Sequence, residues 1–470
     1  MITLCPSVRW PRNRKISGVF LWNHKHLKET GAMKKRDMIR KCSAVFLAGL
    51  MTLTGGADQG EAYWAAETSG YPAEEWNLNK GDFAACLLGP GGENLSIGDS
   101  YAQYQWGLKN DGEVQYIELV NRFEETDPEL AKMIDRNNRL GIPAPVNGPG
   151  VYRQKITQAV KGIDINVLPA WNEYDASKEA RRDVVVAVID TGVDINHPDL
   201  RDSIWVNEDE IPGDGIDNDS NGYVDDRNGW NFFNGNNQIM NGKEEDHGTH
   251  GAGTIAASRG ETGIAGIADN HHVKIMSLKV LGTKHGLGEE SAIMEAIRYA
   301  EANGASICNL SFGSSQYYPE LEQVIRDSGM LFVVAAGNGD AEGIGINIDE
   351  KPEYPAAYDL DNIITVGNLM FDGNLDISSN YGVKSVDVAA PGTFIVSTVA
   401  ENSYGFMNGT SMAAPMVTGA AAFLYSYRTD IGLGDVKRIL LETSRKLPSL
   451  EGKLASGGMI DVYAAIRYGK

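Results

Sequence analysis

Cysteine and, beyond the first residues, basic side chains are scarce in this sequence. The 470 residues include 4 cysteines, at positions 5, 42, 86 and 308, and so few cysteines form no disulfide framework. Residues 1–57 contain 11 Lys and Arg and 2 Asp and Glu, whereas the remaining residues contain 31 and 61, a net charge of −30. Because so acidic a surface repels a phosphate backbone, we expect no nucleic-acid partner.

Long apolar runs are also scarce. One run, residues 44–53, follows the basic cluster Lys34, Lys35, Arg36, Arg40 and Lys41. This is the layout of a secretory signal peptide, and the run is short for a membrane span. Small residues that suit cleavage occur at 55–57 and 62–66, and Met33 begins a more ordinary signal than Met1. We expect an exported or cell-envelope monomer without a stable membrane anchor; an amphipathic or buried helix is the alternative for the run.

From about residue 182 the chain alternates β-branched runs with helical periods. We expect strands at 183–190, 273–281, 306–310, 330–335 and 363–366, and helices at 289–303, 319–327, 410–427 and 435–443. Apolar strands separated by helices predict an α/β fold: a doubly wound, mostly parallel sheet with helices on both faces. The region before it is irregular, with a short helix at 128–140. Cys308 lies in an expected strand and reads as a buried thiol.

Three segments place a carboxylate, an imidazole and a hydroxyl beside glycine: residues 188–194 (continued by 196–200), 246–253 and 408–415. Asp190 ends an expected strand and is suited to orient His247. His247 would then take the proton of Ser411 and return it to a leaving amine. Ser411 opens an expected helix, where backbone N–H groups favour developing negative charge. Each residue alone has a structural interpretation, but together they predict acyl transfer.

A fourth segment completes the candidate site. Asn338 follows an expected strand that ends in Ala-Ala-Gly. Its amide and the Ser411 N–H are the donor types that bind a tetrahedral oxyanion, and losing such a donor costs about 10²–10³ in turnover. His250, the second histidine of its motif, is expected to be structural.

These motifs, in the order Asp, His, Ser, resemble those of the subtilisin-like serine proteases, the subtilases. The resemblance covers residues 161–466 and implies a subtilisin-like fold and endopeptidase activity on polypeptides. It also implies that Ser311, Phe312 and Gly313 pair with the substrate backbone. We therefore divide the chain into a leader over 1–57, an irregular N-terminal region over 58–160 and a single catalytic domain over 161–470. The region 58–160 is either a propeptide or an extension of the catalytic domain, since residues 104–110 resemble the start of a mature subtilase domain.

Two rival functions remain open at this point. One is a catalytically silent binding or scaffold protein that keeps the fold, and the other is a dedicated processing protease with a narrow substrate.

A flat turnover profile from about pH 5 to 9 would count against His247 as the base.

An acidic insert between Asp190 and His247 suggests calcium. Asp217, Asp219 and Asn221 stand at alternate positions before a glycine, like the first half of an EF-hand loop. Position twelve is not the usual glutamate, so Asp225 or Asp226 would supply the missing carboxylate. We expect Ca²⁺ as a structural cofactor, and a solvated acidic loop is the alternative.

A second calcium ligand follows from resemblance alone. In many subtilases the aspartate corresponding to Asp199 shares a calcium site with a loop that corresponds to residues 258–262. Gly260 stands where an asparagine ligand is often found.

Overall fold

The computed structural model describes residues 63–66, 99, 101–121, 128–139, 152–260, 263–282, 287–341 and 343–470. The expected leader over 1–57 lies outside the described residues. The helices are α2 (Pro128–Arg139), α3 (Val167–Ala176), α4 (Asp246–Ala256), α5 (Glu290–Ala302), α6 (Pro319–Asp327), α7 (Thr410–Tyr427), α8 (Leu433–Glu442) and α9 (Val462–Ile466). None of these helices combines the length and apolar character needed to cross a membrane.

The strands are short and lie in four sheets. They are β1 (Tyr63–Ala66), β2 (Gln115–Asn121), β3 (Tyr152–Gln158), β4 (Val184–Asp190), β5 (Gly229–Asn231), β6 (Val273–Lys279), β7 (Leu287–Glu289), β8 (Ala305–Leu310), β9 (Phe312–Gly313), β10 (Leu331–Ala335), β11 (Ile363–Leu369), β12 (Val388–Pro391), β13 (Ile395–Val399), β14 (Ser403–Met407), β15 (Arg445–Lys446) and β16 (Gly458–Met459). In the described part of the chain, nine of them form the central sheet in the order β15-β16-β12-β11-β10-β8-β4-β6-β5. Its neighbours are parallel except β15 and β16. The predicted mostly parallel α/β sheet is confirmed.

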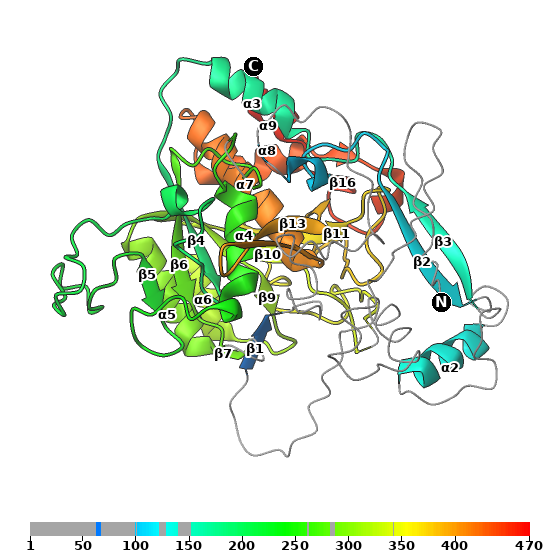
Figure 1. The fold of residues 1–470 in the computed structure, drawn as a ribbon, viewed down its shortest axis with the longest axis horizontal. Coiled ribbons are helices and arrows are strands. Elements are labelled where there is room, and N and C mark those ends of the chain that lie inside the picture. The colour runs from blue at the N-terminus through cyan, green and yellow to red at the C-terminus, as the bar shows by residue number, and fades with distance from the viewer. Residues whose placement is uncertain are drawn as a thin grey trace, which may run out of the picture.

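Helices cover both faces of this sheet (Figure 1). The chain passes from β4 to the edge strand β5, returns through α4 to β6, and then continues past β4 through α5 to β8 and through α6 to β10. The crossovers through α5 and α6 run in the same direction along the sheet, so right-handed connections place both helices on one face, where they pack against each other. Helix α4 packs instead against α7. The strand order reverses at β4, and sheets of this kind bind ligands at the carboxyl ends of the strands beside the reversal. Asp190, the last residue of β4, lies at this point.

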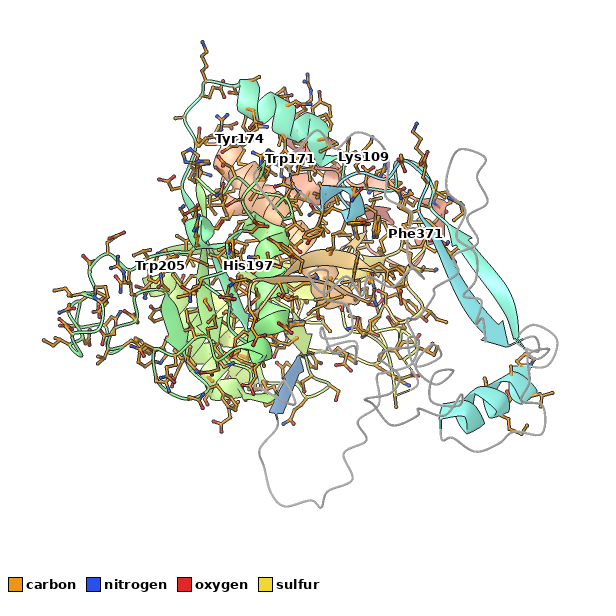
Figure 2. The ribbon with its side chains drawn as sticks, viewed as in Figure 1. Lys109, Trp171, Tyr174, His197, Trp205 and Phe371 are labelled. Carbon is orange, nitrogen blue, oxygen red and sulfur yellow. The ribbon has the colours of Figure 1, made fainter. Side chains whose placement is uncertain are left out.

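Helix α7 forms the centre of the core. All of its residues except Tyr425 are buried, as expected for a helix that is apolar all round. It packs against α4 and against strands β8, β10, β11 and β12. At its far end, Tyr174 of α3 contacts the rings of Phe423 and Tyr427, and its neighbour Trp171 donates to the carbonyl of Ile267 at 2.8 Å (Figure 2). Contacts along its whole length therefore hold α7 in place, and with it the first turn that carries Ser411.

Part of the N-terminal region belongs to the same core. Trp106 and Leu108 are each 1% exposed, and the Trp106 indole donates to the carbonyl of Thr393 at 2.9 Å. The hydrophobic core thus begins ahead of residue 161. The antiparallel ribbon β2–β3 extends away from the sheet, with α2, the helix expected at 128–140, near its end (Figure 1).

Candidate active site

The carboxylate of Asp190 and the imidazole of His247 form a buried pair. Nδ1 of His247 lies 2.8 Å from Oδ1 and 3.0 Å from Oδ2 of Asp190. His247 is 4% exposed and Asp190 is 1% exposed. Their close approach requires Gly248, because a Cβ there would lie 2.1 Å from the carbonyl oxygen of Gly192. With Nδ1 bound to the carboxylate, the imidazole presents Nε2 to a reacting group.

The hydroxyl of Ser411 comes from the neighbouring helix. His247 and Ser411 are each the second residue of their helices, α4 and α7, and these helices pack against each other. One turn further on, a Cβ built on Gly251 would lie 3.4 Å from Cγ of Pro415. The two helices therefore begin next to each other, and the topology brings all three predicted triad residues to one end of the sheet.

A proline in α7 frees a carbonyl beside the nucleophile. Pro415 has no N–H, so the carbonyl of Ser411 lacks its usual helical donor. The hydroxyl of Ser311 donates to that carbonyl at 3.1 Å, and the Ser411 hydroxyl donates to the Ser311 carbonyl at 3.1 Å. The amide of Asn309 in turn donates to the Ser311 hydroxyl at 2.9 Å. The end of β8 is thereby joined to the first turn of α7.

The amide of Asn338 has one end bound and the other free. Its Oδ1 accepts from the backbone N–H and the hydroxyl of Thr410 at 2.8 and 3.1 Å. Its Nδ2 is buried and has no hydrogen-bond partner among the described residues. The backbone contact fixes which end of the amide faces the helix, so the NH₂ group points elsewhere. A free donor beside Ser411 is what an oxyanion requires.

A buried ion pair that the sequence did not single out, Lys279 with Glu245, lies beside the turn that follows Asp190. Nζ of Lys279 donates to Glu245 at 2.9 Å, and neither side chain has any exposed area. Lys279 also donates to the carbonyl of Thr191, the residue after Asp190. Glu245 immediately precedes α4, so this ion pair joins the turn after β4 to the start of the helix that carries His247. The signal that could have revealed it is Lys279 itself, a lysine within the mainly apolar run expected as a strand at 273–281.

The remaining polar candidates near the site are structural. His250 is fully buried, and its Nε2 lies 2.8 Å from the carbonyl oxygen of Ile395. Burial lowers the pKa of this imidazole to about 3, so it stays neutral. Cys308 is buried in β8, and burial raises the pKa of its thiol. A thiol held protonated is a poor nucleophile.

Strand β9, with Ser311 just before it, pairs with a segment of the N-terminal region. Residues 63–66 of the same chain, β1, pair antiparallel with β9 on one side and with β7 on the other (Figure 1). Ala65 is opposite Gly313 and Ala66 is opposite Phe312. The next position along β9 toward its start is Ser311, whose carbonyl contacts the Ser411 hydroxyl. The edge expected to pair with substrate is thus paired with a segment of the N-terminal region.

The acidic insert brings three carboxylates together. Glu210, Asp219 and Asp226 each place an oxygen within 4.8 Å of the others. Asp219 and Asp226 were predicted as ligands, whereas Glu210 was not, because it precedes the EF-hand-like pattern. The hydroxyl of Tyr299 donates to Asp226 at 2.5 Å. Burial, and to a lesser extent this hydrogen bond, raises the pKa of the tyrosine. Hard oxygen donors of this kind fit Ca²⁺.

The other residues proposed as ligands make hydrogen bonds within the loop, as Glu210 also does. Asp217 accepts the N–H groups of Asn221 and Gly222, and Asn221 donates its amide to Asp219 and Asp226. Asp225 accepts three N–H groups, those of residues 213–215, on the outer side of the loop. These residues shape the insert and orient the carboxylates.

Asp199 lies away from the insert. It is 2% exposed, and its Oδ2 accepts the N–H of Ile264 at 3.0 Å. A Cβ at Gly263 would lie 2.0 Å from the same oxygen, so the following loop packs directly on this carboxylate. The Asp199 carboxylate is not among the three that gather in the insert.

Comparison with known proteins gives consistent matches. A model of the subtilase family matches residues 181–458. The chain is 36% identical over 325 residues to Subtilisin-like protease 1 of Plasmodium falciparum, which covers 65% of this chain and 46% of that protein. It is 37% identical over 277 residues to the Major intracellular serine protease of Bacillus subtilis, covering 57% of this chain and 78% of the relative. An Intracellular serine protease of Paenibacillus polymyxa is 35% identical over 275 residues, covering 58% and 74%. The chain spans about half the length of the Plasmodium relative.

Proposed function

Because this chain belongs to the subtilase family, we propose that it is a serine endopeptidase that hydrolyses polypeptides through an acyl-enzyme on Ser411. The observation that carries the proposal is the free, buried NH₂ group of Asn338 beside the first turn of α7. A buried amide donor without a partner is costly for a protein that only binds or scaffolds. It is useful where negative charge develops during a reaction.

The proposed reaction assigns one role to each group. The Ser411 hydroxyl attacks the peptide carbonyl while Nε2 of His247 accepts its proton, and Asp190 stabilises the resulting imidazolium. Nδ2 of Asn338 and the Ser411 N–H bind the oxyanion. His247 then protonates the leaving amine, and water repeats the sequence to release the acid and restore the hydroxyl. A protonated His247 cannot accept the proton, so activity is expected to fall as the pH is lowered and the imidazole becomes protonated.

Substrate is proposed to bind as a strand between β7 and β9. The pairing of β1 with both strands supports this, since main-chain hydrogen bonds along a sheet edge accept many sequences. Ser311, Phe312 and Gly313 would pair with the residues before the scissile bond. Because β1 fills the same edge, residues 58–160 would act at least in part as a propeptide that must leave before a substrate enters.

Calcium is proposed as a structural cofactor of the insert. Glu210, Asp219 and Asp226 would hold it, because their oxygens converge and their charges repel one another without a cation. The ion would stabilise the loop and take no part in peptide hydrolysis. Asp199 remains a proposed ligand of a second site.

Export is proposed from the basic and apolar leader, residues 34–53. Two of the relatives carry the word intracellular in their names, so location separates this chain from them. Detection of the processed chain outside cells would support export, and retention of an unprocessed chain in the cytosol would contradict it.

Labelling with a fluorophosphonate probe tests the catalytic proposal. The purified full chain and the chain after N-terminal processing are treated with the probe, and the labelled peptide is found by mass spectrometry. We expect label on Ser411 of the processed chain, none on S411A, and weaker labelling of the full chain. A folded, processed chain that takes no label would instead be a silent scaffold. A peptide-library cleavage profile then distinguishes a broad protease from a dedicated processing enzyme.

A further inference from the structure

The side chain of Asn380 binds the backbone on both sides of Asn338. Its Oδ1 accepts the N–H of Gly339 and the N–H of Ile346, both at 3.0 Å. Its Nδ2 donates to the carbonyl of Ala336 at 2.9 Å, and its own N–H donates to the carbonyl of Gly337 at 2.9 Å. Asn380 is 1% exposed, so these contacts are shielded from water.

The segment that Asn380 holds lies outside helix and strand, and its other contacts include the N–H of Ala336 to the carbonyl of Val366 at 3.0 Å and the N–H of Gly337 to the hydroxyl of Thr410 at 3.1 Å. Residues 336–339 follow β10 without helix or strand. Gly337 and Gly339 have φ values of 98° and 90°, a region that glycine enters easily and leaves easily. Asn338 therefore lies between two flexible joints, and its side-chain direction depends on what fixes the backbone there.

We propose that Asn380 is a positioning residue for the oxyanion donor, and this inference rests on the catalytic role proposed for Asn338. The side-chain amide of Asn380 binds residues 336 and 339 and its backbone N–H binds residue 337, while Thr410 holds Oδ1 of Asn338. Together they leave the Asn338 backbone and amide one orientation, with Nδ2 toward the reacting carbonyl. A donor that is preorganised in this way stabilises the transition state without reorganisation during the reaction.

This role differs from a general contribution to folding. Asn362 makes the same kind of contact at the opposite end of β10, where its Nδ2 donates to the carbonyls of Ile325 at 2.7 Å and Ser328 at 3.2 Å. That amide also bridges two backbone segments but lies far along the strand from Asn338. Asn362 is therefore a matched control for the loss of a backbone-bridging amide.

A double-mutant cycle in kcat tests the proposal on the processed chain. N338A is expected to lower kcat about 10²–10³-fold, and N380A about 10–100-fold with little change in KM, since a small misplacement of a catalytic group has effects of that size. In the N338A background, N380A should lower kcat less than about threefold, because the group it positions is gone. N362A should lower thermal stability but leave kcat within about twofold. If N380A does not fold, the near-isosteric N380D, which loses the donor to Ala336, takes its place in the cycle.

The possible outcomes are distinct. Equal loss of kcat from N380A in both backgrounds, or no loss in either, overturns the positioning role and leaves the catalytic assignment intact. An unchanged kcat in N338A, with Ser411 still labelled by the probe, overturns the oxyanion role of Asn338 and this inference with it. A strong loss in the wild-type background alone supports the proposal.

Discussion

The active-site end of the sheet and the acidic insert are both rich in carboxylates, but they hold them in different ways. Asp190 lies at the end of a buried strand beside a buried histidine. The carboxylates of the insert, residues 207–228, are held by loop N–H groups and amide side chains, as Asp217 and Asp225 show. The first region takes its geometry from strands, helices and burial. The second takes it from side chains whose like charges oppose one another, so only the second should depend on a cation.

The largest expected effect comes from the Asp–His pair of the site. D190N should lower kcat about 10⁴-fold, because a neutral amide neither fixes the tautomer of His247 nor stabilises its cation. Asp183, at the other end of β4, pairs with His272 at the same 2.8 Å distance, but the side chains are 87% and 36% exposed. D183N should leave kcat within about twofold. Steady-state kinetics of both variants against one peptide substrate make the comparison, and similar kcat values in the two would contradict the assignment.

The buried ion pair behind Asp190 should matter more than any exposed pair. K279M leaves the Glu245 carboxylate buried without a cation, which typically costs about 3–5 kcal/mol. The exposed pair Arg438–Asp435, at 2.7 Å with both side chains nearly half exposed, is the control. R438M should leave the free energy of unfolding almost unchanged, because solvent screens an exposed pair. Urea unfolding of the two variants measures this, and the double variant K279M/E245M should recover much of the loss.

Acid should weaken the site end through His250. Its pKa is about 3 in the folded chain and near 6.5 when unfolded, so between these values the unfolded state binds more protons. The contribution of neutral, buried His250 to the free energy of unfolding is complete above about pH 6.5. It falls as the pH drops toward 3, by up to about 1.4 kcal/mol per pH unit. H250Q keeps a donor for the Ile395 carbonyl and should flatten this slope. H271Q, at an 83% exposed histidine that pairs with Asp269, should change the slope far less, and equal slopes in wild type and H250Q would refute the argument.

What the sequence predicts well is what local patterns encode. Asp190 ends a continuous apolar run, and Ser411 opens a helix beside glycine, so strand, helix and motif could be assigned before any contact was known. Lys279 and Glu245 are joined by the topology across 34 positions, and Asn380 reaches Gly339 across 41. The hydrophobic periodicity of a local stretch of sequence does not predict contacts between residues so far apart in the chain. The geometry of the insert was still harder to predict from the sequence, because hydrogen bonds between side chains and the loop backbone decide which carboxylates converge. Spacing alone pointed to Asp217 and Asp225 and gave no sign of Glu210, whose carboxylate converges with those of Asp219 and Asp226.

The smallest expected effect lies in the insert, where metal binding and not catalysis should change. E210Q removes one of the three converging carboxylates and should weaken calcium binding about 10–100-fold. E208Q, an exposed glutamate two positions earlier, is the matched control. Tb³⁺ luminescence excited through tyrosine reports occupancy, because the Tyr299 hydroxyl contacts Asp226. At saturating calcium a hundredfold weaker site lowers the unfolding free energy by about 2.7 kcal/mol at most, and EDTA should remove the difference between the two variants. Since Asp190 and His247 are held by backbone elements and burial, kcat should stay within about twofold in both variants. A loss of kcat in E210Q that calcium does not restore would mean that the insert supports the active site directly and that the two regions are not independent.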